Sequence, residues 1–296
     1  MNLFFDSKNK LGECILWCER KQALFWVDIV GRTLSQLTLV DKVLTQWYMP
    51  ESLSCIALTN DDDFLLLGLA SRLAFFSLVN QSITTICAVE PEFALTRLND
   101  GRCDRQGRFV FGTLNQHSDR AKLGSFYRLD HDLGLERLPI ASVAIANSVC
   151  FSADGKTMYY CDSLVKAIYQ CDYDSNSPSA FVPRLFVNLA DQAGVPDGSI
   201  IDAEGYLWNA QWGGGVLVRY SPDGAEVQRV NLPITQPTCP TFGGDRLDTL
   251  FVTSATDELS EIQLAQQVQA GGVFAHQPSG ILGLPEQRFI IGKKPL

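Results

Sequence analysis

Side chains that could hold a metal ion recur at wide, nearly regular intervals along the chain: Glu13, Asn99, Asn147 and Asp197. Their carboxylate and amide oxygens are hard ligands, suited to Ca²⁺, Mg²⁺ or Mn²⁺, with Zn²⁺ a less favoured occupant. The three histidines, at positions 117, 131 and 276, are not spaced as a ligand pair, which argues against a histidine-built zinc site. A shared cation site requires a fold that brings four distant segments together.

The segments between these residues are predicted to be short strands joined by tight turns. Residues 103–113, 151–162 and 201–210 each show strand, glycine turn and strand, with the turn glycines at Gly107, Gly155 and Gly205. Glycine tolerates the positive φ that such turns demand. Weaker copies precede the apolar runs 24–28, 64–68 and 249–253. The six anchors of this repeat fall at positions 21, 63, 107, 155, 205 and 248.

This repeat predicts an all-β, six-bladed β-propeller. A period in the forties with about four strands per unit is typical of a propeller blade, whereas the coils of a competing β-solenoid are usually shorter. Six blades use the whole chain, so we expect residues 1–296 to form a single domain. Helical patterns are confined to short stretches near 189–194 and 259–269.

In a propeller, the innermost strand of each blade lines a central channel, so residues in register surround the same axis. Counting back by the same eight positions from each anchor reaches Glu13, Cys55, Asn99, Asn147, Asp197 and Pro240. The count predicts a metal site in the channel, held by Glu13, Asn147 and Asp197. The simpler alternative is that these polar groups only hydrogen-bond water.

Composition narrows the partners and the compartment. Lys and Arg total 24 against 33 Asp and Glu, a formal net charge of −9 that disfavours nucleic acid. No apolar stretch approaches the length of a membrane span, and residues 1–12 lack the apolar region of a signal peptide. None of the nine cysteines forms a CxxC pair, which fits buried thiols in a reducing compartment. We therefore expect a cytoplasmic monomer or dimer.

Four motifs resemble the gluconolactonase/regucalcin (senescence-marker-protein) family, and the similarity covers nearly the whole chain. Residues 11–17 (LGECILW) resemble its LGEGPxW entry, 97–101 (RLNDG) its RxNDG motif, 147–157 its PNGxxxSPDGKT motif, and 195–208 its PDGxxxDxxGxLW motif. Residues 280–285 resemble its closing strand. One such motif is weak because Asp-Gly hairpins are common, but four in the family's order are specific.

The resemblance implies roles for the channel residues. It makes Glu13, Asn147 and Asp197 the ligands of one divalent metal ion (Ca²⁺, Zn²⁺, Mn²⁺ or Mg²⁺), with Asp197 also the favoured general base. It places Arg97 and Asn99 on the substrate. Such a metal would act as a Lewis acid on a lactone carbonyl.

The chain also departs from the family pattern. Cys14 replaces a usual glycine, and Ala146 and Ser148 replace the proline and glycine that flank the ligand asparagine. Relatives often carry a sugar-contacting glutamate a few residues after the Gly-Thr pair at 112–113. Counting places His117 there, and we expect it to bind substrate or, equally, to lie in a surface loop.

The expected function is metal-dependent hydrolysis of a small-molecule sugar lactone, such as a glucono-, arabinono- or xylonolactone, to the aldonic acid. A non-enzymatic calcium-binding or regulatory propeller would use the same ligands but gives no reason for Arg97 and Asn99 beside them. A third alternative is a protein-interaction propeller with an inert channel, which predicts an exposed patch on its rim.

Overall fold

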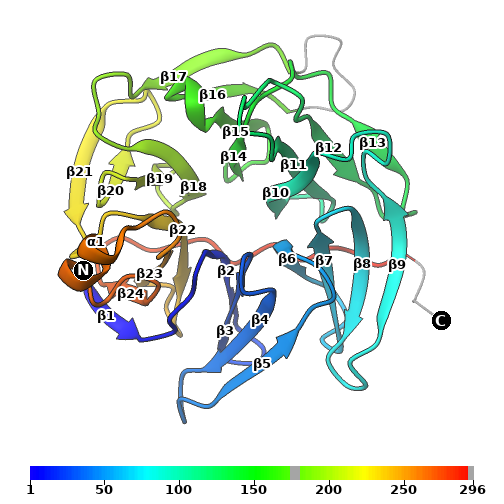
Figure 1. Ribbon diagram of the computed structural model, residues 1–296, viewed down its shortest axis with the longest axis horizontal. Helices are drawn as coiled ribbons and strands as arrows, with labels where there is room; N and C mark the ends of the chain where they lie inside the picture. The colour runs from blue at the N-terminus through cyan, green and yellow to red at the C-terminus, as the bar shows by residue number, and fades with distance from the viewer. Residues whose placement is uncertain (174–180, 293–296) are drawn as a thin grey trace.

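A computed structural model of the chain, which describes residues 1–173 and 181–292, shows six four-stranded antiparallel sheets around a central axis (Figure 1). The predicted all-β, six-bladed propeller is confirmed. That residues 1–296 form one domain stays a prediction, since residues 174–180 and 293–296 lie outside the described parts.

Each sheet runs from an innermost strand at the channel to an edge strand at the periphery. The innermost strands are β2 (Gly12–Cys18), β6 (Leu53–Leu58), β10 (Thr96–Cys103), β14 (Ala146–Phe151), β18 (Val195–Ile201) and β22 (Pro237–Gly243). The second strands are β3 (Ala23–Asp28), β7 (Phe64–Leu69), β11 (Phe109–Asn115), β15 (Thr157–Asp162), β19 (Leu207–Trp212) and β23 (Thr249–Ser254). These strands are buried on both faces, which explains their nearly continuous apolar sequences.

The outer strands complete the sheets. The third strands are β4 (Thr33–Thr38), β8 (Arg72–Ser77), β12 (Phe126–Leu129), β16 (Ala167–Asp172), β20 (Val216–Tyr220) and β24 (Val273–His276). The edge strands are β5 (Leu44–Tyr48), β9 (Ile83–Ala88), β13 (Leu135–Arg137), β17 (Arg184–Asn188), β21 (Glu226–Asn231) and β1 (Asn2–Phe5). The predicted turn glycines Gly107, Gly155 and Gly205 all adopt positive φ, between 71° and 83°.

The ring closes differently from the expectation for residues 280–285. The N-terminal strand β1 pairs with β24 and completes the sixth sheet, so both ends of the chain contribute to one blade. Residues 280–285 form no strand of their own; they make an isolated bridge between Gly283 and Asp202, and the Gly283 N–H donates to the Leu247 carbonyl (2.7 Å). Helix α1 (Glu261–Gln266) falls inside the stretch expected to be helical, whereas 189–194 holds only a turn; the short 3₁₀ helix η1 (Ser163–Val165) was not expected.

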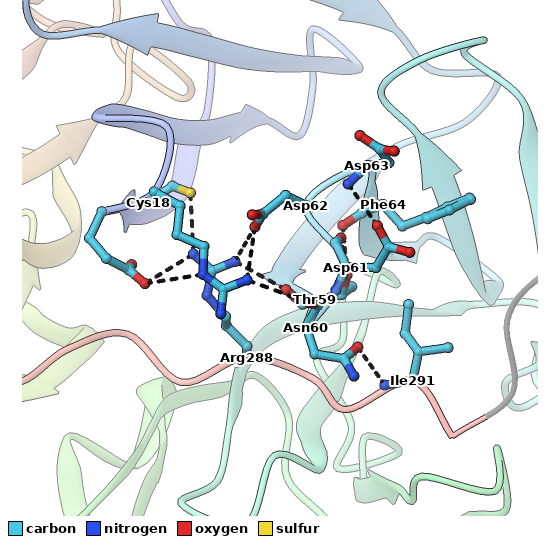
Figure 2. Close-up of polar contacts among 11 residues, drawn as sticks. Cys18, Thr59, Asn60, Asp61, Asp62, Asp63, Phe64, Arg288 and Ile291 are labelled. Carbon is cyan, nitrogen blue, oxygen red and sulfur yellow. Dashed lines mark hydrogen bonds and ion pairs between the residues drawn. The ribbon is translucent and has the colours of Figure 1, made fainter.

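Residues 277–292, which we call the C-terminal segment, cross the ring at the end of the channel where the innermost strands finish (Figure 1). Phe289 is fully buried and bridges to Thr59, and Glu286 forms a buried ion pair of 3.0 Å with Arg102. Arg288 joins the first two sheets, with nitrogens 3.0 Å from the Asp62 carboxylate and 3.4 Å from the sulfur of Cys18 (Figure 2). The segment therefore ties together blades that are distant in sequence.

Candidate active site

A pocket of about 360 Å³ opens at the other end of the channel, where the innermost strands begin. Its deepest polar groups come from four different sheets: Glu13 on β2, Asn99 on β10, Asn147 on β14 and Asp197 on β18. The structure thus brings together the four residues that the repeat had placed in register. Apolar walls are supplied by residues that include Leu11, Ile29, Leu114, Ile145, Val195 and Trp212.

β-bulges at these residues help to direct their side chains. The register shifts in all six innermost strands, for example between Glu13 and Leu16 and between Asn147 and Cys150. A bulge bends its strand and redirects a side chain, here at the start of each channel-lining strand. The residues that precede the shift, equivalent in pairing to Glu13, are Leu53, Leu98, Asn147, Pro196 and Pro237. Asn99 and Asp197 therefore lie one residue further along, inside their bulges, whereas the counted positions Cys55 and Pro240 lie beyond theirs.

The carboxyl groups of Glu13 and Asp197 share a hydrogen bond. Burial, followed by the charge of Asp100, raises the pKa of Glu13 to about 8. Burial, followed by the charge of Glu13, raises the pKa of Asp197 well above its ordinary value. Because two adjacent carboxylates in a buried site repel, the pair retains a proton unless a cation replaces it.

The two amides are oriented by a continuous hydrogen-bond chain. Asn99 Nδ2 donates to Asn147 Oδ1 (2.9 Å) and to the Ala146 carbonyl (2.8 Å), while Asn147 Nδ2 donates to Ser163 Oγ (2.9 Å). Because Nδ2 of Asn99 and Nδ2 of Asn147 both donate hydrogen bonds, Asn147 presents its oxygen on the pocket side. A carbonyl oxygen has two lone pairs, so Asn147 Oδ1 can accept from Asn99 and still act as a ligand.

Arg97 lies beside these groups. Its Nη1 donates to Asn99 Oδ1 (2.8 Å), to the Leu98 carbonyl (2.8 Å) and to Ser54 Oγ (3.3 Å). Burial lowers the pKa of Arg97 to about 10, an effect that the negative charge of Glu13 opposes. The guanidinium remains charged at neutral pH and can brace an oxygen that gains negative charge.

The donor set fits a divalent cation. Two carboxylates and one amide oxygen meet in the pocket, all of them hard oxygen ligands, and a cation would relieve the repulsion between Glu13 and Asp197. Within residues 1–173 and 181–292, no three His, Cys, Asp or Glu side chains are grouped so that they alone could hold a metal ion.

The departures from the family motif lie next to Glu13 and Asn147 in the sequence. Cys14 and Ser148 occupy glycine positions and adopt the left-handed conformation, with φ of 46° and 62°. Ser148 Oγ donates to the Asp197 carbonyl (2.5 Å) and accepts from Asn209 Nδ2 (3.2 Å). The backbone of Ser148 is therefore strained, but its hydroxyl joins a buried hydrogen-bond network that holds the backbone of Asp197.

His117 does not line the pocket. Its imidazole is about half exposed and lies 3.2 Å from the Asp119 carboxylate in the loop after β11. The same loop sends Arg120 into the pocket instead, and Asp257 and Glu258 reach it from the loop after β23. Sequence reasoning missed these three residues because they lie in loops, outside the repeat that identified the others.

Comparison with known proteins identifies relatives of the chain. A family model described as SMP-30/Gluconolactonase/LRE-like region matches residues 11–256. An L-arabinolactonase of Azospirillum brasilense is 51% identical over 276 residues, 93% of this chain and 91% of that protein. Regucalcin of Gallus gallus is 34% identical over 289 residues, 96% of each chain. The solved structure of a calcium-binding protein, regucalcin, from Agrobacterium tumefaciens superposes with a TM-score of 0.91 at 28% identity, covering 97% of this chain and 96% of the other.

Proposed function

The chain belongs to the SMP-30/gluconolactonase/LRE-like family, and we propose that it hydrolyses a sugar lactone to the open aldonic acid. The observation that carries the proposal is the pocket itself. In it, Glu13, Asn147 and Asp197 converge next to Arg97 and Asn99, two side chains able to hold a hydroxylated ligand. The relative that is 51% identical is named a lactonase, which supports the same reaction class here.

The proposed substrate is a five-carbon 1,4-lactone, with arabinonolactone as the first compound to test. This choice follows the name of the L-arabinolactonase relative, with xylonolactone and gluconolactone as alternatives. A pocket of about 360 Å³ has room for such a ring together with water. Its mixture of apolar walls and polar side chains suits a ring that carries hydroxyl groups.

We propose Glu13, Asn147 and Asp197 as the ligands of a divalent cation, with Ca²⁺ the first candidate because the donors are hard oxygens. When bound, the cation would supply Lewis-acid polarisation of the lactone carbonyl. The calcium-binding description of the Agrobacterium tumefaciens structure supports this choice, with Zn²⁺, Mn²⁺ and Mg²⁺ as alternatives.

The side chains of the protein perform the proton transfers and the positioning. Asp197 accepts a proton from the water whose oxygen attacks the carbonyl carbon. Once the new carbon–oxygen bond has formed, the ester bond of the ring breaks, and the departing ring oxygen takes the proton back from Asp197 to become a hydroxyl group. Asn99 and Arg97 hold the ligand, and the Arg97 guanidinium braces the oxygen that gains negative charge.

The second candidate function is a calcium-binding, regulatory propeller without turnover. The observation that favours it is that regucalcin of Gallus gallus aligns along 96% of both chains, and that the same carboxylates and amide would serve both functions. It differs from the lactonase in one measurable respect, because it predicts metal binding without acid release.

The test is acid release from a panel of five- and six-carbon aldonolactones, before and after EDTA, with single divalent metals added back. Hydrolysis of one lactone well above its spontaneous rate, lost with EDTA and restored by one metal, is the expected result. Tight stoichiometric metal binding without hydrolysis of any lactone would reject the lactonase and favour the regulatory propeller.

A further inference from the structure

Arg120 differs from the residues on either side of it in its loop by where it lies. Residues 116–119 and 121–123, between β11 and β12, are all exposed, whereas Arg120 is half-buried and lines the pocket. The loop therefore places one of these side chains in the pocket, and that side chain ends in a permanently charged guanidinium.

The loop is built to hold Arg120 in this position. Arg120 Nη1 donates to the Asn115 carbonyl (2.8 Å), and its own backbone adopts a left-handed φ of 48°. The side chain of Asn115, fully buried, organises the rest of the loop. Its Nδ2 donates to the Ala121 carbonyl (3.0 Å) and its Oδ1 accepts from the His117 N–H (2.9 Å). Strain and buried hydrogen bonds of this kind are expected where a side chain must be positioned.

The charge of Arg120 is not held in an ion pair. In the part of the chain that the structure describes, neither Arg120 nor Arg97 has a carboxylate within ion-pairing distance, although Asp257 and Glu258 line the same pocket. The positive charge of Arg120 contributes to the lowered pKa of Arg97. Two guanidinium groups in one pocket repel each other. Nη1 of Arg120 donates to the Asn115 carbonyl, and the remaining N–H groups of the guanidinium are available to a ligand that carries acceptor oxygens.

The elements that carry the two arginines separate their tasks. Arg97 bonds Asn99 beside the proposed metal ligands, where the carbonyl would react, whereas Arg120 comes from a surface loop. We infer that Arg120 is a specificity-determining residue, which donates hydrogen bonds to the exocyclic hydroxyl of the lactone, on the side of the ring remote from the carbonyl. The inference rests on the proposed function and extends it to the recognition of the sugar.

The test compares two lactones that differ only in the group recognised. Arabinono-1,4-lactone carries an exocyclic hydroxymethyl group, and a tetrono-1,4-lactone has the ring hydroxyls but no exocyclic carbon. Arg120→Met should raise KM for the five-carbon lactone by about tenfold or more, the effect of losing a hydrogen bond from a charged donor, and leave KM for the four-carbon lactone within about twofold of wild type. For both lactones kcat should change by less than about threefold.

Two further variants make the result interpretable. Arg120→Lys keeps the positive charge but lacks the paired N–H groups of the guanidinium. Its KM for the five-carbon lactone should therefore lie between those of wild type and Arg120→Met. Arg246→Met is the matched control, since this side chain is 81% exposed, pairs with Asp248 and does not line the pocket; its kinetics should match wild type. Thermal midpoints of all variants establish that each is folded.

The outcomes separate the inference from the proposed function. If wild type hydrolyses the lactones and Arg120→Met has an unchanged KM, the inference is overturned and the lactonase function stands. The same conclusion follows if KM rises equally for both lactones. If wild type hydrolyses no lactone, the function fails. Calorimetric binding of arabinonate and of the four-carbon tetronate then decides the inference. Weaker binding of arabinonate alone by Arg120→Met supports it, and equal affinities overturn it.

Discussion

The carboxyl groups of Glu13 and Asp197, on innermost strands of different sheets, share a hydrogen bond in the channel. Burial, followed by the negative charge of neighbouring carboxylates, raises the pKa of both groups and favours their protonated forms. The pair links proton binding, metal binding and folding at one point of the molecule, and the first prediction follows from that linkage.

The metal-free protein should lose stability as the pH rises from about 5 to about 8. The pKa of Glu13 is raised from its ordinary value to about 8, so the folded state retains a proton that the unfolded chain has already released. The contribution of Glu13 to the free energy of unfolding is fully present below its ordinary pKa and is lost as the pH rises through its raised pKa. Thermal midpoints in EDTA measure it, and Ca²⁺ should raise the midpoint more at pH 8 than at pH 6. A calcium shift that is independent of pH would contradict the assignment of the ligands.

Asp197→Asn should abolish most turnover. The amide has the same shape but cannot accept the proton of the attacking water, and removal of a general base typically costs about 10²- to 10⁴-fold in rate. Initial rates of acid release are the measurement, with metal content determined in the same samples. A variant that keeps both its metal and full turnover would show that Asp197 is not the base.

Asn115→Ala should reproduce the KM effect of Arg120→Met in weaker form. Asn115 does not line the pocket, but its buried side chain holds the loop that carries Arg120. Loss of these hydrogen bonds should cost about 1–3 kcal/mol of stability and let Arg120 leave its position. Steady-state kinetics with arabinono-1,4-lactone and urea unfolding are the measurements. Lower stability with an unchanged KM would mean that the loop does not position Arg120.

Phe289→Ala should destabilise the propeller by about 3–5 kcal/mol, because the removed ring is fully buried and leaves a cavity. Ile290→Ala is the matched control. The Ile290 side chain, next to Phe289 in the sequence, is 41% exposed, so its removal should cost less than about 1 kcal/mol of stability. Urea unfolding compares the two. Equal losses would show that the C-terminal segment is not anchored through Phe289.

The repeat was sufficient to predict the blades, because Gly107, Gly155 and Gly205 mark the same turn in successive sheets. It was insufficient for the closing strand, since Asn2–Phe5 carries no turn signal and pairs with a strand at the opposite end of the chain. Strand pairing between distant segments is set by tertiary packing, which local patterns do not encode.

The same division applies to the site. Glu13, Asn99, Asn147 and Asp197 were predictable because each stands near the start of an innermost strand, within one residue of the same pairing position. Arg120 was not, since a loop can place any of several residues inward and a count along the sequence selected His117. The assigned roles of the site residues stay predictions until the experiments above are done.

The C-terminal segment has a consequence for the kinetics of the enzyme. It covers the end of the channel opposite the pocket and leaves there a cavity of only about 20 Å³, room for about one water molecule. We therefore expect the channel to be open to solvent at the pocket end alone. Substrate must enter and the aldonate must leave by one mouth, past Arg120, so the two cannot pass each other. Product inhibition should accordingly be competitive, and slow departure of the anion would limit turnover at high substrate concentration.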